Sequence, residues 1–161
     1  MSWTITPSPV DHPDAVTVLR EYFDDVASRY YGRQASEEEI DRALAEDPSD
    51  QLVPPTGVFL IARDDGEITG CVGVKVAAPG TTELTRMFVK PAFRGQGSGS
   101  RLLLAAEEAA RGLGARIMRL DTRSDLVEAR ALYAKHGYRE VAPYGERLYA
   151  DHWFEKELEA L

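Results

Sequence analysis

A glycine-rich stretch between an expected strand and an expected helix reads Val89-Lys90-Pro91-Ala92-Phe93-Arg94-Gly95-Gln96-Gly97-Ser98-Gly99-Ser100. Pro91 ends the strand, because proline has no N–H to donate to a sheet ladder. Glycines at alternate positions let the backbone approach a ligand closely and present its N–H groups at the start of a helix. Arg94 adds a positive charge beside them. The stretch therefore predicts a strand, a cradle for an oxyanion or a phosphate, and a helix, in that order.

Two other glycine-loop motifs are excluded by their spacing. The dinucleotide-binding pattern Gly-x-Gly-x-x-Gly would need glycine at position 100 or 102, where the chain has Ser100 and Leu102. The nucleotide triphosphate loop needs Gly-Lys followed by Ser or Thr, and no lysine immediately follows these glycines. A tight turn from strand to helix that binds no ligand remains the alternative.

Apolar spacing, caps and turns on either side of this stretch predict the other elements. Strands are expected at 3–6, 58–62, 68–76, 84–90, 117–121, 138–141 and 151–157. Helices are expected from Pro13 to Gly32, after a capping box at Ser36, from Ser100 to Gly112, and from a capping box at Asp125 and Glu128 to Gly137. The first helix is expected to bury Val16, Leu19 and Phe23. This order predicts an α/β (α+β) fold with a mixed, mostly antiparallel central sheet of about seven strands and about four helices.

Length and composition indicate one globular domain over residues 1–161. The chain has 43% hydrophobic residues, 29% charged residues and one cysteine, Cys71, which leaves no intrachain disulfide. No apolar run is long enough to span a membrane, and a basic and apolar leader is not recognised, so we expect a cytoplasmic protein. The net charge of −8 disfavours nucleic acid. Residues 66–150 nevertheless carry a net +4, so a small polyanion remains a candidate ligand.

Three linked segments resemble the GNAT superfamily of N-acetyltransferases. Arg94-x-x-Gly97-x-Gly99 matches that family's acyl-CoA pyrophosphate motif, Arg/Gln-x-x-Gly-x-Gly/Ala. The segment 83–89 is similar to its fourth strand, and the segment 129–138 to its Ala-x-x-Leu/Phe-Tyr-x-x-x-Gly-Phe/Tyr pattern. The resemblance implies a sheet that is splayed between its fourth and fifth strands.

The resemblance also implies that acetyl-CoA is the co-substrate. Its pyrophosphate would lie on the backbone N–H groups of the cradle, and its pantetheine arm would pair with the edge of the fourth strand. The residues assigned to this binding are Met87, Phe88, Val89, Arg94, Gly95, Gln96, Gly97, Ser98, Gly99 and Ser100. The chain departs from the family at Leu126, where many relatives have an asparagine that contacts the cofactor.

Tyr133 and Glu83 are the candidate catalytic residues that the resemblance implies. Tyr133 would protonate the leaving sulfur, and a core role on its helix is the alternative. Glu83 would act as a base through water, and an exposed position at a strand start is the alternative. Cys71 is expected to pack in the sheet and His136 to cap a helix, and no metal site is expected.

The acceptor is expected to be a primary amine of a small molecule or a peptide. It would lie against Tyr22, Tyr30, Tyr31 and the loop Tyr144-Gly145-Glu146-Arg147. Residues 1–65 have a net charge of −9, which favours a cationic amine. The alternatives are a non-catalytic acyl-CoA-binding or sensing module and a structural domain. Neither a nucleic acid nor a membrane is expected as a partner, and a homodimer stays open.

Overall fold

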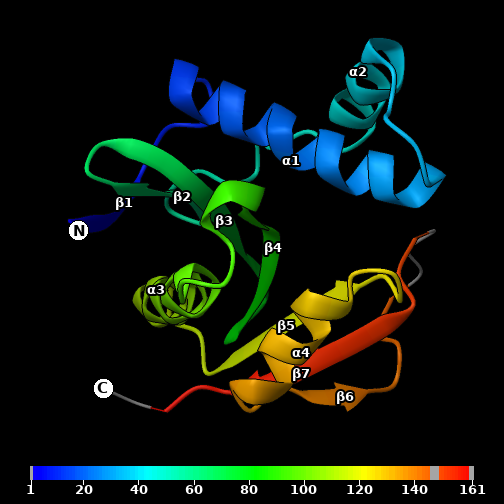
Figure 1. Ribbon diagram of the computed structural model, residues 1–161. Helices are drawn as coiled ribbons and strands as arrows, with labels where there is room; N and C mark the ends of the chain where they lie inside the picture. Colours follow the sequence, from blue (N-terminus) through cyan, green and yellow to red (C-terminus); the bar gives the residue numbers. More distant parts are fainter. Residues whose placement is uncertain (1, 146–148, 160–161) are drawn as a thin grey trace.

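The computed structural model describes residues 2–145 and 149–159, which form one layered sheet with helices on both faces (Figure 1). The elements, in chain order, are β1 (Trp3–Pro7), α1 (Pro13–Tyr31), α2 (Glu37–Glu46), β2 (Gly57–Asp64), β3 (Glu67–Ala78), β4 (Thr81–Val89), the 3-10 helix η1 (Pro91–Phe93), α3 (Ser98–Gly112), β5 (Ile117–Thr122), α4 (Val127–Lys135), β6 (Arg139–Val141) and β7 (His152–Glu157). Within these residues, no helix has the length and apolar character that a bilayer crossing demands.

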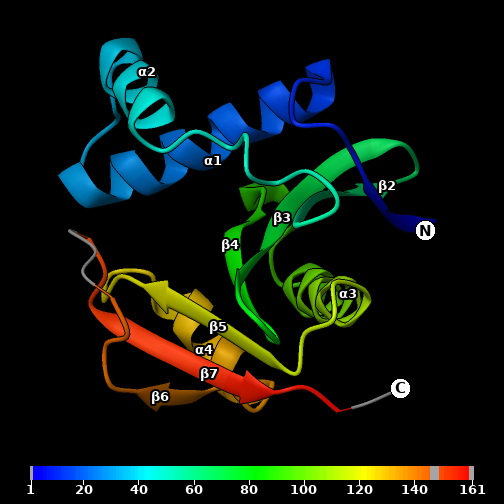
Figure 2. The same cartoon turned by 180° about the vertical axis from the view of Figure 1, so that it is seen from behind.

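The seven-stranded sheet has the order β1-β2-β3-β4-β5-β7-β6. Every neighbouring pair is antiparallel except β4 and β5, which run parallel. These two strands pair only from Thr81 opposite Ile117 to Glu83 opposite Arg119. Beyond that point β4 and β5 diverge, which is plain when the molecule is seen from behind (Figure 2). The predicted mixed sheet, splayed between its fourth and fifth strands, is confirmed.

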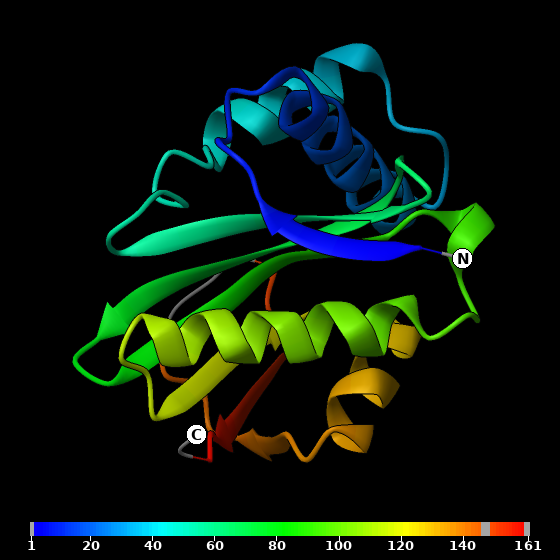
Figure 3. The same cartoon turned by 90° about the vertical axis from the view of Figure 1, so that its left-hand side faces the viewer.

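Two cores lie on opposite faces of β1–β4 (Figure 3). On one face, Phe59 and Ile61 of β2 pack against Val18 and Leu19 of α1. On the other face, the alternate residues of β2 pack against α3 in a core that extends to α4 and β7. Because successive side chains of a strand point to opposite faces, the continuous apolar run at 58–62 serves both cores.

Two local predictions are wrong. Val16 is 54% exposed, and α1 instead buries Ala15 together with the expected Leu19 and Phe23. The capping box at Asp125 and Glu128 does not form, because α4 begins at Val127 without a side-chain cap. Both Asp125 oxygens instead accept from the guanidinium of Arg123, and Glu128 pairs with a distant residue of α1. The capping box at Ser36 and the left-handed Gly32 that ends α1 are as predicted.

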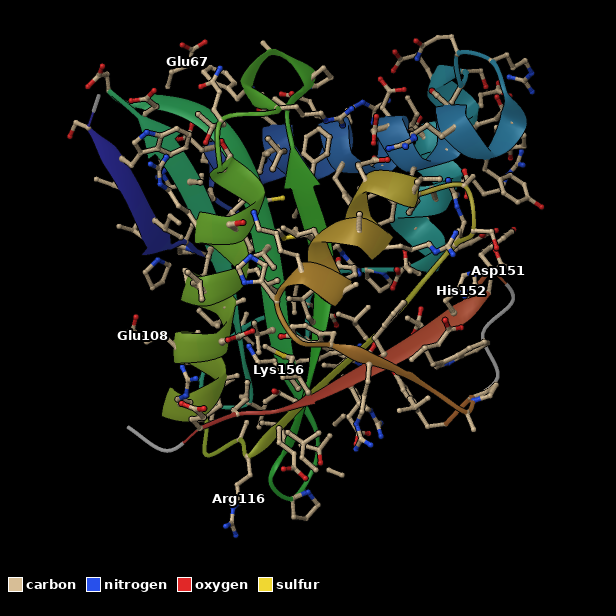
Figure 4. The ribbon with its side chains drawn as sticks, turned by 60° about the horizontal axis from the view of Figure 1, so that its bottom comes forward. Glu67, Glu108, Arg116, Asp151, His152 and Lys156 are labelled. Carbon is tan, nitrogen blue, oxygen red and sulfur yellow. The ribbon has the colours of Figure 1, made fainter. Side chains whose placement is uncertain are left out.

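A buried charge joins α3 to the second half of the sheet. Glu107 is 2% exposed and accepts hydrogen bonds from Tyr138 Oη at 2.9 Å and from Lys156 Nζ at 3.0 Å. Figure 4 shows Lys156 on β7, while the neighbouring Glu108 points outward from α3. Glu107 and Glu108 are thus neighbours on α3, one buried and the other exposed to solvent.

We expect Glu107→Ala to lower the free energy of unfolding by about 2 kcal/mol, because it leaves a half-buried ammonium without its carboxylate. The value lies below that for a fully buried pair, since Lys156 keeps some contact with water. Glu108→Ala removes the same charge from the solvent-exposed side of α3 and should change stability by less than about 0.5 kcal/mol. Urea denaturation measures both, and equal losses in the two variants would contradict the prediction.

Candidate active site

A cavity of about 1030 Å³ lies where β4 and β5 separate. Its walls come from α1, α2, β4, the segment between η1 and α3, the end of β5, and α4. It brings together fourteen of the residues that the sequence singled out as site candidates: Tyr22, Tyr30, Tyr31, Glu83, Met87, Phe88, Val89, Arg94, Gly95, Gly97, Ser98, Gly99, Ser100 and Tyr133. Gln96 and Tyr144 do not line it.

The glycine stretch, which is the predicted cradle, has positive-φ residues directly before α3. Gly95 and Gly97 have φ values of +79° and +81°, a region that favours glycine over residues with side chains. Gly97 is the N-cap of α3 and supplies no side-chain hydrogen bond, so the first N–H groups of this 15-residue helix lack a capping partner. The helix begins at Ser98, two residues earlier than expected, which places Ser98 and Gly99 inside its positive end.

Polar contacts fix both sides of the cradle. Arg94 Nε donates to the Val89 carbonyl at 2.9 Å, and its guanidinium lies 3.5 Å from an oxygen of Asp25 on α1. On the other side, the Ser100 hydroxyl lies 2.9 Å from His136 Nε2. His136 is the C-cap of α4, as expected, and it also joins the cradle to α4. An anion arriving here would meet backbone N–H groups, one hydroxyl and one arginine.

A β-bulge interrupts β4 beside the cavity. Cys71 of β3 faces Phe88, and Gly73 faces Thr85, so Arg86 and Met87 together stand opposite Val72. A bulge of this kind leaves one residue unpaired and re-aims the strand. Met87 and Val89 are half-buried and line the cavity, whereas Phe88 is 5% exposed and also packs into the core beneath α1.

Tyr133 lies in the cavity wall and in the core at once. Its side chain is almost fully buried, with its ring 5.9 Å from that of Tyr138 and 6.2 Å from that of Phe154. Burial raises the pKa of Tyr133 well above the ordinary tyrosine value, and the nearby Tyr22 and Asp121 raise it further. The phenol therefore keeps its proton throughout the neutral range.

Glu83 is 3% exposed and lies inside β4, which begins at Thr81 rather than at residue 84. The alternative of an exposed residue at a strand start is therefore wrong. Glu83 occupies the last position at which β4 pairs with β5, opposite Arg119. Glu83 therefore lies where the gap between the two strands begins, and it lines the cavity.

The acceptor candidates divide into two groups. Tyr22, Tyr30 and Tyr31 of α1 line the cavity, and Tyr30 and Tyr31, at the end of the helix, are 53% and 42% exposed. Tyr144 packs elsewhere, with the Arg119 guanidinium 4.3 Å from its ring centre. Gly145 does not line the cavity either, while residues 146 and 147 of that predicted loop lie outside the described residues.

Several cavity residues were not predicted from the sequence. Tyr149 precedes β7, is 50% exposed, and its ring centre lies 5.0 Å from that of Tyr30. Arg29 of α1 donates to the Glu128 carboxylate of α4, with NH2 2.8 Å from Oε2, and this lowers the pKa of Glu128. Both contacts join residues about a hundred positions apart, and no periodicity or local motif marks such a pair.

The remaining chemically reactive side chains serve the fold. Cys71 is fully buried in β3, where its thiol donates to the Arg86 carbonyl at 3.4 Å, and burial raises its pKa. His12 caps α1 through Nδ1. Across residues 2–145 and 149–159, no group of three or more histidine, cysteine, aspartate or glutamate side chains is arranged to hold a metal ion.

A comparison with family models supplies the observation that decides the family. The model described as the acetyltransferase (GNAT) family matches residues 17–138. The chain belongs to the GNAT acetyltransferase family. Membership supports acyl-CoA-dependent N-acetyl transfer as its general activity.

Individual GNAT relatives agree with this assignment. An uncharacterised N-acetyltransferase of Schizosaccharomyces pombe is 33% identical over 138 residues, which cover 84% of this chain and 81% of that protein. The aminoalkylphosphonate N-acetyltransferase of Salmonella typhimurium is 32% identical over 94 residues, which cover 55% of this chain and 61% of the relative. The PaiA N-acetyltransferase of Thermoplasma acidophilum, solved in complex with coenzyme A, has a TM-score of 0.76 and 25% identity, with 98% of this chain and 99% of that chain covered. GNAT proteins of this fold therefore bind CoA.

Proposed function

We propose that this GNAT protein transfers an acetyl group from acetyl-CoA to a primary amine of a small molecule or a peptide, by direct attack of the amine on the thioester. The observation that supports this proposal is the single cavity that joins the glycine cradle, the bulged edge of β4, Tyr133 and Glu83. An anion site, a strand edge and two proton-transfer groups are what such a reaction needs in one continuous space.

The cradle suits the diphosphate of CoA. Residues 95–100 place two positive-φ glycines and the uncapped start of α3 around one concave surface. Arg94 would exchange its contact with Asp25 for the phosphates, and Ser100 would donate its hydroxyl while His136 holds it in place. The pantetheine arm would pair with the β4 edge at Met87 and beyond, in the gap that the separation from β5 leaves. Bound there, acetyl-CoA supplies an activated thioester.

Three groups of the protein would then handle charge and protons. The amine nitrogen forms a bond to the acetyl carbon and loses a proton to Glu83 through water. A backbone N–H at the bulge would donate to the acetyl oxygen as negative charge develops on it. The carbon–sulfur bond breaks, and the Tyr133 hydroxyl gives its proton to the sulfur as negative charge develops there. The Tyr133 oxygen then regains a proton from solvent.

The acceptor would enter past the exposed tyrosines. Tyr30 and Tyr31 line this edge of the cavity, and Tyr149 meets Tyr30 from the other side. Tyrosine rings can pack against the apolar part of an amine and can also bind a cation over the ring face. The acidic character of residues 1–65 favours a positively charged amine over an anion. Tyr144 does not line the cavity, so we leave it out of the proposed acceptor site.

A thiol-release assay with acetyl-CoA and a panel of amines tests the proposal. The panel contains a polyamine, an aminoalkylphosphonate, an aromatic amine and a peptide with a free N-terminus. We expect release of CoA thiol at a rate at least about 100-fold above hydrolysis without acceptor for at least one class, with the acetylated amine found by mass spectrometry. Tight CoA binding with no transfer to any amine would contradict catalysis and favour the non-catalytic binding module.

A further inference from the structure

Arg86 is unusual in β4 because its backbone is left-handed inside a strand. Its φ is +57°, and the other non-glycine with positive φ among the described residues is Asp65, in the β2–β3 turn. A residue with a side chain adopts this conformation only when surrounding contacts hold it there. Such strained positions concentrate at functional sites. Arg86 forms the bulge together with Met87, beside the strand edge that would carry the thioester.

The guanidinium of Arg86 is bonded on every side. Its Nε donates to Ser49 Oγ at 3.1 Å, and NH1 donates to Thr85 Oγ1 at 2.8 Å. NH2 donates to the Asp47 carbonyl at 2.9 Å and lies 3.2 Å from the Asp47 carboxylate. The group also stacks over the Phe23 ring, 5.2 Å from its centre. The side chain is 6% exposed, so these protein partners use its hydrogen-bonding capacity and leave little for a substrate.

These contacts join two opposite walls of the cavity. Segment 47–49 continues α2 toward β2, and Glu46 and Asp47 line the cavity from that side. Met87 lines it from β4. The Arg86 side chain therefore connects the segment after α2, next to the proposed acceptor position, with the strand next to the proposed thioester position.

We propose that Arg86 is a positioning residue that sets the separation of the acceptor amine and the thioester. The inference rests on the proposed acetyl transfer, and adds to it the element that aligns the two reactants. Alignment matters because a displacement of about 1 Å between reacting groups can cost about 100-fold in rate. Arg86 is itself among the residues that line the cavity, but its guanidinium donates to segment 47–49 and to Thr85, so we assign it a role through the loop and the bulge rather than a contact with either reactant.

Three substitutions test this role. Arg86→Met keeps most of the side-chain volume and removes the hydrogen bonds to segment 47–49 and to Thr85. We expect kcat to fall about 10- to 100-fold, while the affinity for acetyl-CoA stays within about threefold of the wild type. Arg86→Gly accepts the left-handed backbone without strain and should show the same loss of kcat. Arg86→Lys restores one positive charge without the forked geometry and should recover part of kcat. Initial rates of thiol release at varied substrate concentrations give kcat and the KM for each substrate, and calorimetry gives the affinity for CoA.

Arg63→Met is the matched control. Arg63 of β2 donates to Asp14 of α1 at 2.8 Å, is half-buried, and lies outside the cavity wall. It should lower the melting temperature while kcat stays within about twofold of the wild type. Wild-type kcat in folded Arg86→Met and Arg86→Gly would overturn the inference and leave the proposed function intact. So would a loss of kcat that is no larger than in Arg63→Met at equal loss of stability. A wild-type protein that binds CoA but acetylates no amine would overturn the proposed function and this inference with it.

Discussion

Tyr133→Phe is expected to lower kcat at least about 100-fold while the dissociation constant of acetyl-CoA changes by less than about twofold. The substitution removes one hydroxyl from the cavity wall and keeps the ring that packs against Tyr138 and Phe154. Without that hydroxyl the thiolate must leave unprotonated, and loss of general acid catalysis typically costs 10²–10⁴-fold. Thiol release under saturating substrates measures the first quantity, and calorimetry the second.

Tyr138→Phe is the control for this variant. It deletes a buried tyrosine hydroxyl from the same core, but that hydroxyl donates to Glu107 and lies outside the cavity wall. We expect lower stability with kcat unchanged. If both variants lose kcat equally, the hydroxyl of Tyr133 acts through packing and is not the acid.

The pH profile provides a second measurement for Tyr133. Its pKa is raised, so the neutral phenol that donates the proton persists to higher pH than an ordinary tyrosine would allow. The amine acceptor becomes reactive as it loses its proton, near a pKa of about 10.4 for a lysine-like amine. We therefore expect kcat/KM to rise with pH and to show no falling limb below about pH 10. A falling limb in that range, in a protein that stays folded, would contradict the assignment.

Gly97→Val is expected to weaken CoA binding about 100-fold. Gly97 has φ +81°, which a β-branched residue strongly resists, and it precedes the first N–H groups of α3. A Cβ atom added there would meet no other atom within 4 Å, so we expect the variant to fold. Relief of the strain moves the very N–H groups that would hold the diphosphate, and charge-assisted hydrogen bonds contribute about 1.5–3 kcal/mol each. Calorimetric titration with CoA measures the loss.

Gly66→Val is the control, because it introduces the same kind of backbone strain at a glycine outside the cradle. Gly66 has φ +86°, meets nothing within 4 Å, and lies in the β2–β3 turn outside the cavity wall. Both variants should lose similar stability, but only Gly97→Val should lose CoA affinity. Unchanged CoA affinity in Gly97→Val would contradict the proposal that the cradle binds the diphosphate of CoA.

Features that depend on a few neighbouring residues could be predicted from the sequence. The Ser36 capping box and the Gly32 helix end are encoded within one turn of chain. The turn from β4 into α3 is also local, because it contains Gly95 and Gly97, whose φ values are positive. The predicted capping box at Asp125 failed for an equally local reason, since the adjacent Arg123 takes both of its oxygens.

Features that depend on tertiary contacts could not be predicted. The bulge at Arg86 is stabilised by bonds to residues 47–49, almost forty positions earlier in the chain. The approach of Tyr149 to Tyr30 and the pairing of Arg29 with Glu128 exist only once the end of α1 meets α4 and the segment before β7. No periodicity in the sequence records which surface side chains will meet across a cavity.

The three paired positions between β4 and β5 have a mechanical consequence. Backbone hydrogen bonds join the two halves of the sheet at this short seam and at the adjacent Gly80, which accepts from the N–H groups of Arg116 and Ile117. Apolar contacts with α3 and the polar contacts of Glu107 with Tyr138 and Lys156 also join them. Beyond the seam, side-chain contacts rather than strand pairing hold the two halves together. The width of the opening therefore depends on these side chains, while each half of the sheet keeps its own ladders of backbone hydrogen bonds.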